Sequence, residues 1–147
     1  MEVNTYLNFD GQCEDAFKFY EQCLGGQMGP IFRYGGSPMA GTVSPEWQDK
    51  VMHGSLIIGS HVLMGADVPP RQFEHVKGFS LSVQIASPDE ADRIFQALAE
   101  NGQVVLPLEQ TFWAERFGMV VDRFGIPWMI NCGESSRPVD QMTYVNE

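Results

Sequence analysis

Residues 79–85 read F-S-L-S-V-Q-I, and residues 87–90 read S-P-D-E. Apolar and polar side chains alternate in the first segment, a pattern that predicts a β-strand with one buried face. The second segment has a serine cap, a proline in the first turn and a glutamate three residues after the serine, which predicts the start of a helix. Asn101-Gly102 predicts the end of that helix. Its expected apolar face consists of Ala91, Ile94, Phe95 and Leu98.

The N-terminal half repeats this order, and the repeat is the main evidence for the architecture. Residues 3–9 read V-N-T-Y-L-N-F and alternate in the same way, and a helix is expected between Asp10-Gly11 and Gly25-Gly26. Each half then closes with a predicted hairpin, formed by residues 51–58 and 61–66 in the first half and by residues 117–121 and 126–132 in the second. We therefore expect an α+β fold of two βαβββ modules, with mixed sheets that curve around a pocket.

The modules and their connections give the expected domain organisation. We expect residues 1–147 to form a single domain, with a first module at 1–66, a linker at 67–77, a second module at 78–133 and a C-terminal tail at 134–147. The connection at residues 35–50 is long and contains two prolines. It is therefore a candidate lid.

Composition limits the classes of partner. Nine basic and 19 acidic residues give a formal net charge of −10, which argues against nucleic acid and against anionic membranes. The three cysteines have no metal-finger or CxxC spacing, and no apolar run approaches the ~20 residues of a membrane span. We therefore expect a soluble cytoplasmic protein with reduced thiols.

The alternating strands leave a polar face on each predicted sheet. This face carries Tyr6 and Asn8 in the first module and Ser80 and Ser82 in the second, while the helices cover the apolar faces. Such a face either contacts a ligand or is an ordinary solvated sheet face. The presence of two such modules favours the pocket, and the solvated face stays the alternative.

Four segments of the chain resemble a known family. They are residues 6–11 (Y-L-N-F-D-G) with Ala16 and Phe19-Tyr20, residues 53–56 with 63–67, residues 110–114 with Phe117-Gly118, and residues 122–131 (D-R-F-G-I-P-W-M-I-N). Together they resemble the vicinal oxygen chelate superfamily of glyoxalase I, bleomycin- and fosfomycin-resistance proteins and extradiol dioxygenases. The local motifs are most similar to its PhnB-like branch, often labelled 3-demethylubiquinone 3-methyltransferase-like. The resemblance implies a glyoxalase/bleomycin-resistance-like fold, a homodimer and pockets between sheets.

The resemblance also implies where a metal would bind. Metal-dependent relatives place His or Glu on four strands. The resemblance implies that the matching positions here are Asn4 or Tyr6, a position at about Met64, Ser80 or its neighbours, and Met129 or Asn131. None of these is a His, Asp, Glu or Cys, the side chains that divalent metals prefer. We therefore predict no cofactor and no metal ligands. A divalent metal bound by His53 with Glu109, Glu115 or Asp122 is the alternative.

His53 is the candidate catalytic residue. Strand parity groups it with Ser55 and opposite Leu56, so its imidazole is expected on the ligand face. There it is either a proton-transfer group or an ordinary hydrogen-bonded sheet histidine. Trp128 shares its parity with Ile130 and is expected in the core. The predicted ligand-binding residues are Tyr6, Asn8, His53, Met64, Ser80, Ser82, Trp113, Phe117, Met129 and Asn131.

Three functions follow from these features. We favour a protein that binds a small aromatic or cationic molecule without a standard metal site, because no nucleophile–base pair is evident and the acidic charge suits a cationic guest. The alternative is a metal-dependent or His53-dependent lyase or isomerase of the glyoxalase type. Methyl transfer is not expected, because the chain has no glycine-rich strand-to-helix turn and no doubly wound alternation. The third is an interaction module with no small ligand.

Overall fold

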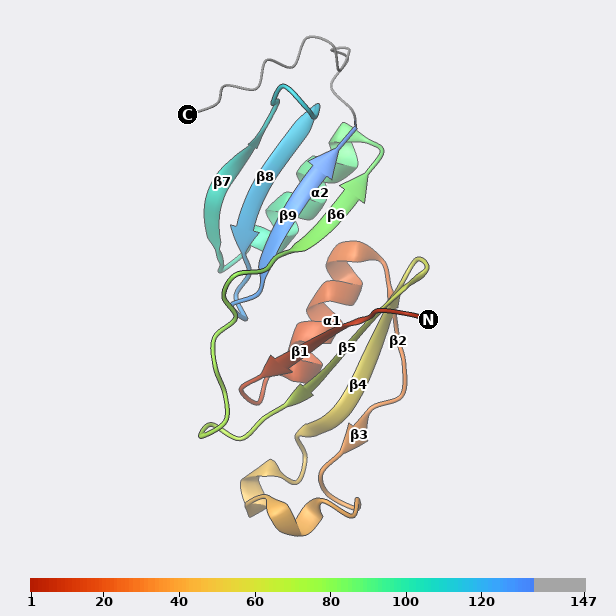
Figure 1. The fold of residues 1–147 in the computed structure, drawn as a ribbon, viewed down its shortest axis with the longest axis vertical. Helices are drawn as coiled ribbons and strands as arrows, with labels where there is room; N and C mark the ends of the chain where they lie inside the picture. The colour runs from red at the N-terminus through yellow and green to blue at the C-terminus, as the bar shows by residue number, and fades with distance from the viewer. Residues whose placement is uncertain (134–147) are drawn as a thin grey trace. The chain divides into compact units, whose positions relative to one another are not determined.

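The computed structural model describes residues 1–133, which fold as two units; the first ends at His75 and the second begins at Val76. Each unit consists of one mixed β-sheet with one α-helix against it (Figure 1). The helix of each unit contacts the strands of its own sheet. The two units are described separately below.

The first unit has the predicted β-α-β-β-β order with short additions. Its elements are β1 (Thr5–Phe9), α1 (Cys13–Leu24), β2 (Gln27–Met28), β3 (Phe32–Arg33), the 3-10 turns η1 (Ala40–Thr42) and η2 (Pro45–Trp47), β4 (Val51–Ile58) and β5 (His61–Asp67). The sheet order is β1-β5-β4-β2, and β3 also pairs with β4. β1 runs parallel to β5, and the other pairs are antiparallel.

The second unit repeats this topology. Its elements are β6 (Leu81–Ile85), α2 (Pro88–Ala99), β7 (Gln103–Glu109), β8 (Arg116–Val121) and β9 (Pro127–Cys132). The sheet order is β6-β9-β8-β7, with β6 parallel to β9. The predicted α+β fold of two βαβββ modules is thus confirmed. The pocket, the linker at residues 67–77 and the single domain stay predictions, and the predicted tail at 134–147 lies outside the described residues.

The helix ends are formed by the residues that the sequence indicates. The hydroxyl oxygen of Ser87 accepts a hydrogen bond from the backbone N–H of Glu90 at 3.5 Å, at the start of α2. Asn101, two residues after α2, has a left-handed φ of 56°. Gly25 ends α1 with a φ of 75°, a conformation that glycine adopts without strain.

Strand bounds differ from the expected ones where pairing stops. β4 has the expected range, whereas β6 begins at Leu81, two residues later than the alternation predicts. Leu81 pairs with Trp128, and one step earlier the partner would be Pro127, which has no backbone N–H to donate. Ser80 therefore lies just before the strand.

In each unit a glycine allows a helix aromatic to reach the sheet. A Cβ atom added at Gly65 would lie 2.9 Å from Cζ of Phe17, and one added at Gly118 would lie 2.8 Å from Cε2 of Phe95. Both contacts are shorter than packed side chains allow, so a larger residue would push the helix away. The core of the first unit contains Leu7, Phe9, Phe17, Tyr20 and Leu56.

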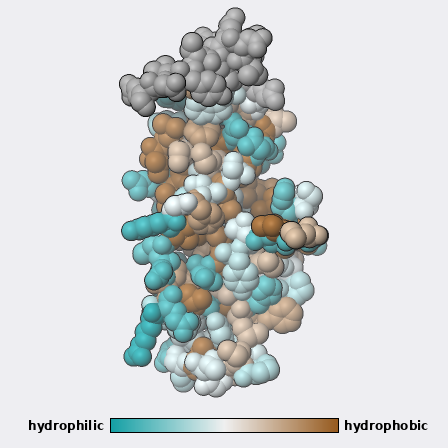
Figure 2. Space-filling view, viewed as in Figure 1, coloured by the Kyte–Doolittle hydropathy of each residue, from teal (hydrophilic) through white to brown (hydrophobic). Residues whose placement is uncertain are grey.

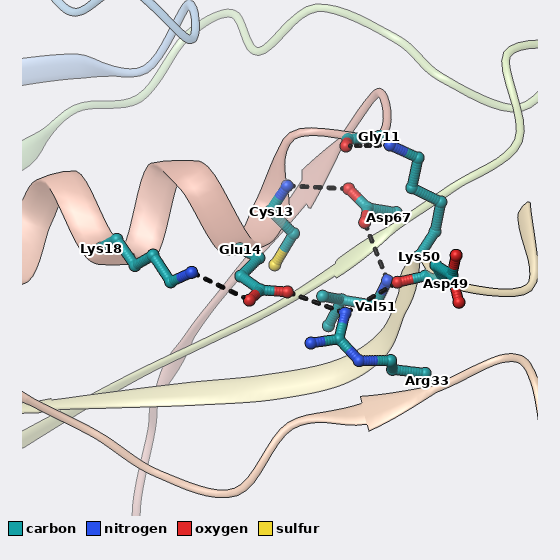
Figure 3. A network of polar contacts seen from close by, with 9 residues as sticks. All are labelled: Gly11, Cys13, Glu14, Lys18, Arg33, Asp49, Lys50, Val51 and Asp67. Atoms are coloured by element: carbon teal, nitrogen blue, oxygen red, sulfur yellow. Dashed lines mark hydrogen bonds and ion pairs between the residues drawn. The ribbon is translucent and has the colours of Figure 1, made fainter.

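A buried carboxylate joins three segments of the first unit (Figure 3). Asp67 is 1% exposed; its Oδ1 accepts from the backbone N–H of Cys13 at 2.8 Å, and its Oδ2 accepts from that of Val51 at 2.9 Å. The Tyr34 hydroxyl donates to the Asp67 carbonyl oxygen at 2.7 Å. Burial raises the pKa of Asp67, while these backbone donors and the nearby Lys50 lower it in part. The end of β5 thereby holds the starts of α1 and β4.

Asp122 holds the hairpin of the second unit in a similar way. Its Oδ1 accepts from the backbone N–H groups of Phe124 and Ile126, at 2.8 and 3.0 Å. Its Oδ2 accepts from the indole N–H of Trp128 at 2.8 Å. In each unit, therefore, a buried aspartate accepts hydrogen bonds from donors of the same unit.

Backbone and side-chain hydrogen bonds within the connection at residues 35–50 hold its two ends together. The N–H of Gly35 donates to the carbonyl oxygen of Gln48 at 2.7 Å, and the Gln48 amide nitrogen donates to that of Ala40 at 2.9 Å. The rings of Tyr34 and Trp47 meet edge to face, with centroids 6.5 Å apart. A lid role for this segment stays a prediction. No helix within residues 1–133 has the length and apolarity needed to cross a membrane.

Replacing the buried carboxylate tests its structural role. Asp67→Asn exchanges one acceptor oxygen for an N–H₂ group. The remaining oxygen can accept from only one of the backbone N–H groups of Cys13 and Val51, so the other is left buried without a partner. We expect the free energy of unfolding in urea to fall by about 1–3 kcal/mol. The control Asp15→Asn, at an exposed position of α1, is expected to change it by less than ~0.5 kcal/mol. Equal losses in the two variants would contradict the role of Asp67.

Candidate functional site

The first sheet has one face covered by α1 and one open face. Burial follows the strand parity, because Leu7 and Phe9 are buried while Tyr6 and Asn8, which point the other way, are exposed. On the central strands the same open face carries half-buried side chains. These are His53 and Ser55 of β4 and Val62 and Met64 of β5.

Three rings form a row across this open face: Tyr6, His53 and Phe32, called the ring row below. The Tyr6 and His53 rings stack with centroids 5.7 Å apart and planes 30° apart. The His53 and Phe32 centroids are 6.4 Å apart, with planes 32° apart. Tyr6 is 46% exposed and Phe32 is 54% exposed. The row therefore offers aromatic surface on a sheet face whose other groups are mainly neutral.

The strand register explains how the row is assembled. Phe32 of β3 pairs directly with His53 of β4. On the other side, Tyr6 of β1 pairs with Met64 of β5, and Asn8 pairs with Ala66. Continuing the β4–β5 register by one step from the Gly54–Gly65 pair places the small side chain of Ala66 opposite His53. The phenol of Tyr6 can thus cross β5 and reach the imidazole.

Tyr6 and His53 also share a hydrogen bond. The phenol oxygen lies 3.2 Å from Nδ1 of His53. Partial burial is the main cause that raises the pKa of Tyr6, with smaller contributions from Cys13 and Tyr34. The phenol is therefore neutral at physiological pH. The imidazole has a fixed neighbour at Nδ1, which leaves Nε2 for a further partner.

The second sheet has a comparable polar face. The amide nitrogen of Asn131 donates to the amide oxygen of Gln84 at 3.0 Å, and the amide nitrogen of Gln84 lies 3.4 Å from the Ser82 hydroxyl. The amide oxygen of Asn131 has no hydrogen-bond partner among residues 1–133. Ser82 pairs with Met129, which lies on the same face.

An aromatic cluster stands next to this face. Trp113, in the connection between β7 and β8, contacts the Phe117 ring with centroids 5.1 Å apart and the Phe112 ring at 4.7 Å. Phe117 pairs with Asn131 on β9. Trp113 is 39% exposed and Phe112 is 56% exposed.

The predicted site residues thus divide between the two units. The structure brings Tyr6, Asn8, His53 and Met64 together on the open face of the first sheet. It brings Ser82, Phe117, Met129 and Asn131 together on the polar face of the second, with Trp113 beside them. Ser80 lies before β6. Their roles in binding and the catalytic role of His53 stay predictions.

Two important residues were missed at the level of the sequence. Phe32 belongs to a two-residue strand, which is too short to show a period, and the neighbouring residues Ile31 and Arg33 do not add a regular alternation. Asp67 was placed in the linker. Its only signal was a carboxylate directly after an apolar strand, and that does not reveal burial.

The side chains of the open faces do not fit a divalent metal. Within residues 1–133 no three His, Cys, Asp or Glu side chains are grouped so that they could hold an ion. The groups on the first face are a phenol, an imidazole, a primary amide and a thioether, and hard or borderline cations prefer several imidazoles or carboxylates. Asp122, one of the alternative ligands, uses its carboxylate for the hairpin bonds.

Comparison with known proteins gives consistent matches. A family model described as 3-demethylubiquinone-9 3-methyltransferase matches residues 1–131. Protein YjdN from Escherichia coli (strain K12) is 33% identical over 139 residues, which cover 89% of this chain and 95% of that protein. The crystal structure of protein PA1353 from Pseudomonas aeruginosa is 45% identical, with a TM-score of 0.81, and the match covers 90% of this chain and 97% of that one.

More distant structures share the fold. A PhnB protein from Bacillus cereus is 24% identical, with a TM-score of 0.78 over 90% of this chain and 100% of that one. The fosfomycin resistance protein FosX from Listeria monocytogenes is 8% identical, with a TM-score of 0.64 over 90% of this chain and 93% of that one. At such identities the likeness shows the fold alone.

A pair of variants compares the structural roles of the half-buried imidazole of His53 and the buried indole of Trp128. His53→Gln removes a ring from an open face and is expected to change the free energy of unfolding by less than ~0.5 kcal/mol. Trp128→Phe leaves the buried Asp122 without its indole donor and is expected to cost about 1–3 kcal/mol. Urea unfolding followed by circular dichroism measures both. A larger loss for His53→Gln than for Trp128→Phe would show that the ring row is part of the core.

Proposed function

The chain belongs to the 3-demethylubiquinone-9 3-methyltransferase family, and from this premise we propose that it binds a small, flat aromatic molecule on the open face of its first sheet. The observation that carries the proposal is the ring row. Two of its three rings are about half exposed, at 46% for Tyr6 and 54% for Phe32. Stacking of another ring on aromatic rings that are exposed to water lowers the free energy of the complex.

The other groups of the face support a neutral or cationic ligand. Asn8 and Ser55 offer neutral hydrogen-bonding groups, and Met64 offers an adaptable apolar contact. A net charge of −10 disfavours anions and favours cations. An aromatic cation would gain in addition from the faces of the Tyr6 and Phe32 rings.

We do not propose methyl transfer, although the family description names it. In doubly wound folds a nucleotide-like cofactor binds at a glycine-rich turn between a parallel strand and a helix. The two strand-to-helix turns of residues 1–133 are Asp10–Gln12 and Ala86–Ser87, and each leads out of a mixed sheet. Neither turn has the required glycines.

A second candidate function follows from the Tyr6–His53 hydrogen bond. An imidazole held at Nδ1 by a neighbour resembles the arrangement of a general base, which would remove a proton next to a substrate carbonyl at Nε2. This is the lyase or isomerase alternative without a metal. It requires that Nε2 carries no proton.

We further propose that the polar face of the second sheet is a ligand-binding surface of its own unit.

We also propose that the protein is a cytoplasmic homodimer. The dimer is supported by β7, an edge strand that exposes Val104, Val105 and Leu106 at 46%, 54% and 41%. Figure 2 shows hydrophobic surface over this strand. An unpaired edge strand with exposed apolar side chains can pair with a strand of another chain. Sedimentation equilibrium tests the dimer. A monomeric wild type would refute the dimer, and a dimer that persists in Val105→Lys would refute the role of β7 in it.

Binding is tested with 1-indanone, a flat ring ketone, by ligand-observed nuclear magnetic resonance. We expect Phe32→Ala to weaken binding about fivefold, because a stacked ring contributes on the order of 1 kcal/mol. The matched control is Ile57→Ala, which is 45% exposed on the same strand face as His53 but about 13 Å from it along β4. Equal affinities of the wild type and Phe32→Ala would refute the ring row as the site.

The alternative function is tested with the same molecule. A general base at His53 would break the C–H bond next to the carbonyl of 1-indanone and take up its proton, and deuterium from D₂O would replace it. Mass spectrometry measures that exchange. Exchange that the wild type accelerates and His53→Ala does not would favour the enzyme. Exchange no faster with the wild type than in buffer, together with intact binding, would favour the binding protein.

A further inference from the structure

We propose that Tyr6 is a positioning residue that fixes His53 in the tautomer with its proton on Nε2, so that the site selects ligands with a hydrogen-bond acceptor in the ring plane. The selection of ligands rests on the proposed function. The claim about the tautomer does not, because it concerns the protein without a ligand.

The first step is the direction of the Tyr6–His53 hydrogen bond. At 3.2 Å between the phenol oxygen and Nδ1, either group is close enough to donate. A phenol O–H is a stronger hydrogen-bond donor than a neutral imidazole N–H, and an unprotonated imidazole nitrogen is a far stronger acceptor than a phenol oxygen. The favoured bond therefore runs from the Tyr6 O–H to Nδ1 of His53.

The second step is the consequence for the other nitrogen. A neutral imidazole carries one proton, so an Nδ1 that accepts places the proton on Nε2. Among residues 1–133, the bond to Tyr6 is the one hydrogen bond that the structure gives the His53 side chain. Nε2 is thus a donor that a ligand can use.

The third step is the orientation of that donor. The planes of Tyr6 and Phe32 lie 30° and 32° from the imidazole plane, on its two sides along the sheet. The two neighbouring rings limit rotation of the imidazole, which keeps Nε2 aimed in one direction. Because the Nε2–H bond lies in the imidazole plane, an acceptor must approach the edge of this ring, and a carbonyl in the plane and at the rim of a flat ligand can do so.

This arrangement separates the two candidate functions. An Nε2 that carries a proton cannot remove one from a substrate, so a fixed Nε2–H tautomer makes His53 a recognition group. A ring carbonyl of the ligand accepts a hydrogen bond from Nε2–H of His53, whereas a hydrocarbon of the same shape leaves this donor unpaired.

The tautomer is tested in the full-length protein labelled with ¹⁵N-histidine, by long-range ¹H–¹⁵N spectra at a pH where the imidazoles are neutral. The chain has three histidines, and His53→Gln identifies the signals of His53. His61, exposed at the start of β5, is the internal reference for a side chain that exchanges between tautomers. We expect limiting shifts for His53, with an unprotonated Nδ1 and a protonated Nε2.

Two variants show whether Tyr6 causes this state. Tyr6→Phe keeps the ring and removes the hydroxyl, and it is expected to move the His53 shifts toward those of His61. Phe32→Leu removes a neighbouring ring but keeps the hydroxyl, and it is expected to leave the tautomer unchanged. A proton on Nδ1 in the wild type, or no change in Tyr6→Phe, would overturn the proposal.

Ligand selection is tested with 1-indanone and indane, which have the same ring system with and without a carbonyl. We expect the wild type to bind 1-indanone about tenfold tighter than indane, and Tyr6→Phe, in which the donating tautomer is only partly populated, to show a smaller preference. Equal binding of the two probes would refute the selection of acceptors. If neither probe binds while the tautomer is as expected, the proposed function and the selection fail, and the positioning role of Tyr6 stands.

Discussion

The carboxylate of Asp67 is the constraint on which the first unit depends. It lies at the end of β5 and accepts from backbone N–H groups at the start of α1 and the start of β4. Because these two donors would otherwise be buried without partners, the carboxylate determines where the helix begins relative to the sheet. The helix start in turn places Phe17 over Gly65. The covered face is thereby fixed, and the opposite face is left open for the ring row.

The ring row combines features that a purely structural role does not require. Buried aromatic residues of this unit, Phe9 and Phe17, pack edge to face in the core. Tyr6 and Phe32 instead flank a histidine on an exposed surface, and the phenol hydrogen bond orients that histidine. A side chain whose protonation and direction are both controlled is suited to recognition, because little entropy is lost when the ligand binds.

Much of the fold could be predicted from the sequence, since it depends on local patterns. The alternation in residues 51–58 and the cap at Ser87 correspond to β4 and to the start of α2. Parity also places Tyr6 and His53 on one face. Phe32 could not be found in this way, because β3 has two residues and its partner is distant in sequence. The burial of Asp67 depends on α1 and β4 together, and no local pattern encodes it. The ligand contacts and the pocket remain predictions.

Asp67 and Asp122 each satisfy donors of their own unit. Such self-sufficiency has an evolutionary consequence. A substitution on the outer strand face of one unit requires no compensating change at the buried aspartate of the other. The present chain illustrates this independence, because the open face of the first unit has a histidine between two rings and that of the second has amides and hydroxyls. Ligand contacts can therefore change at a few surface positions while both interiors persist.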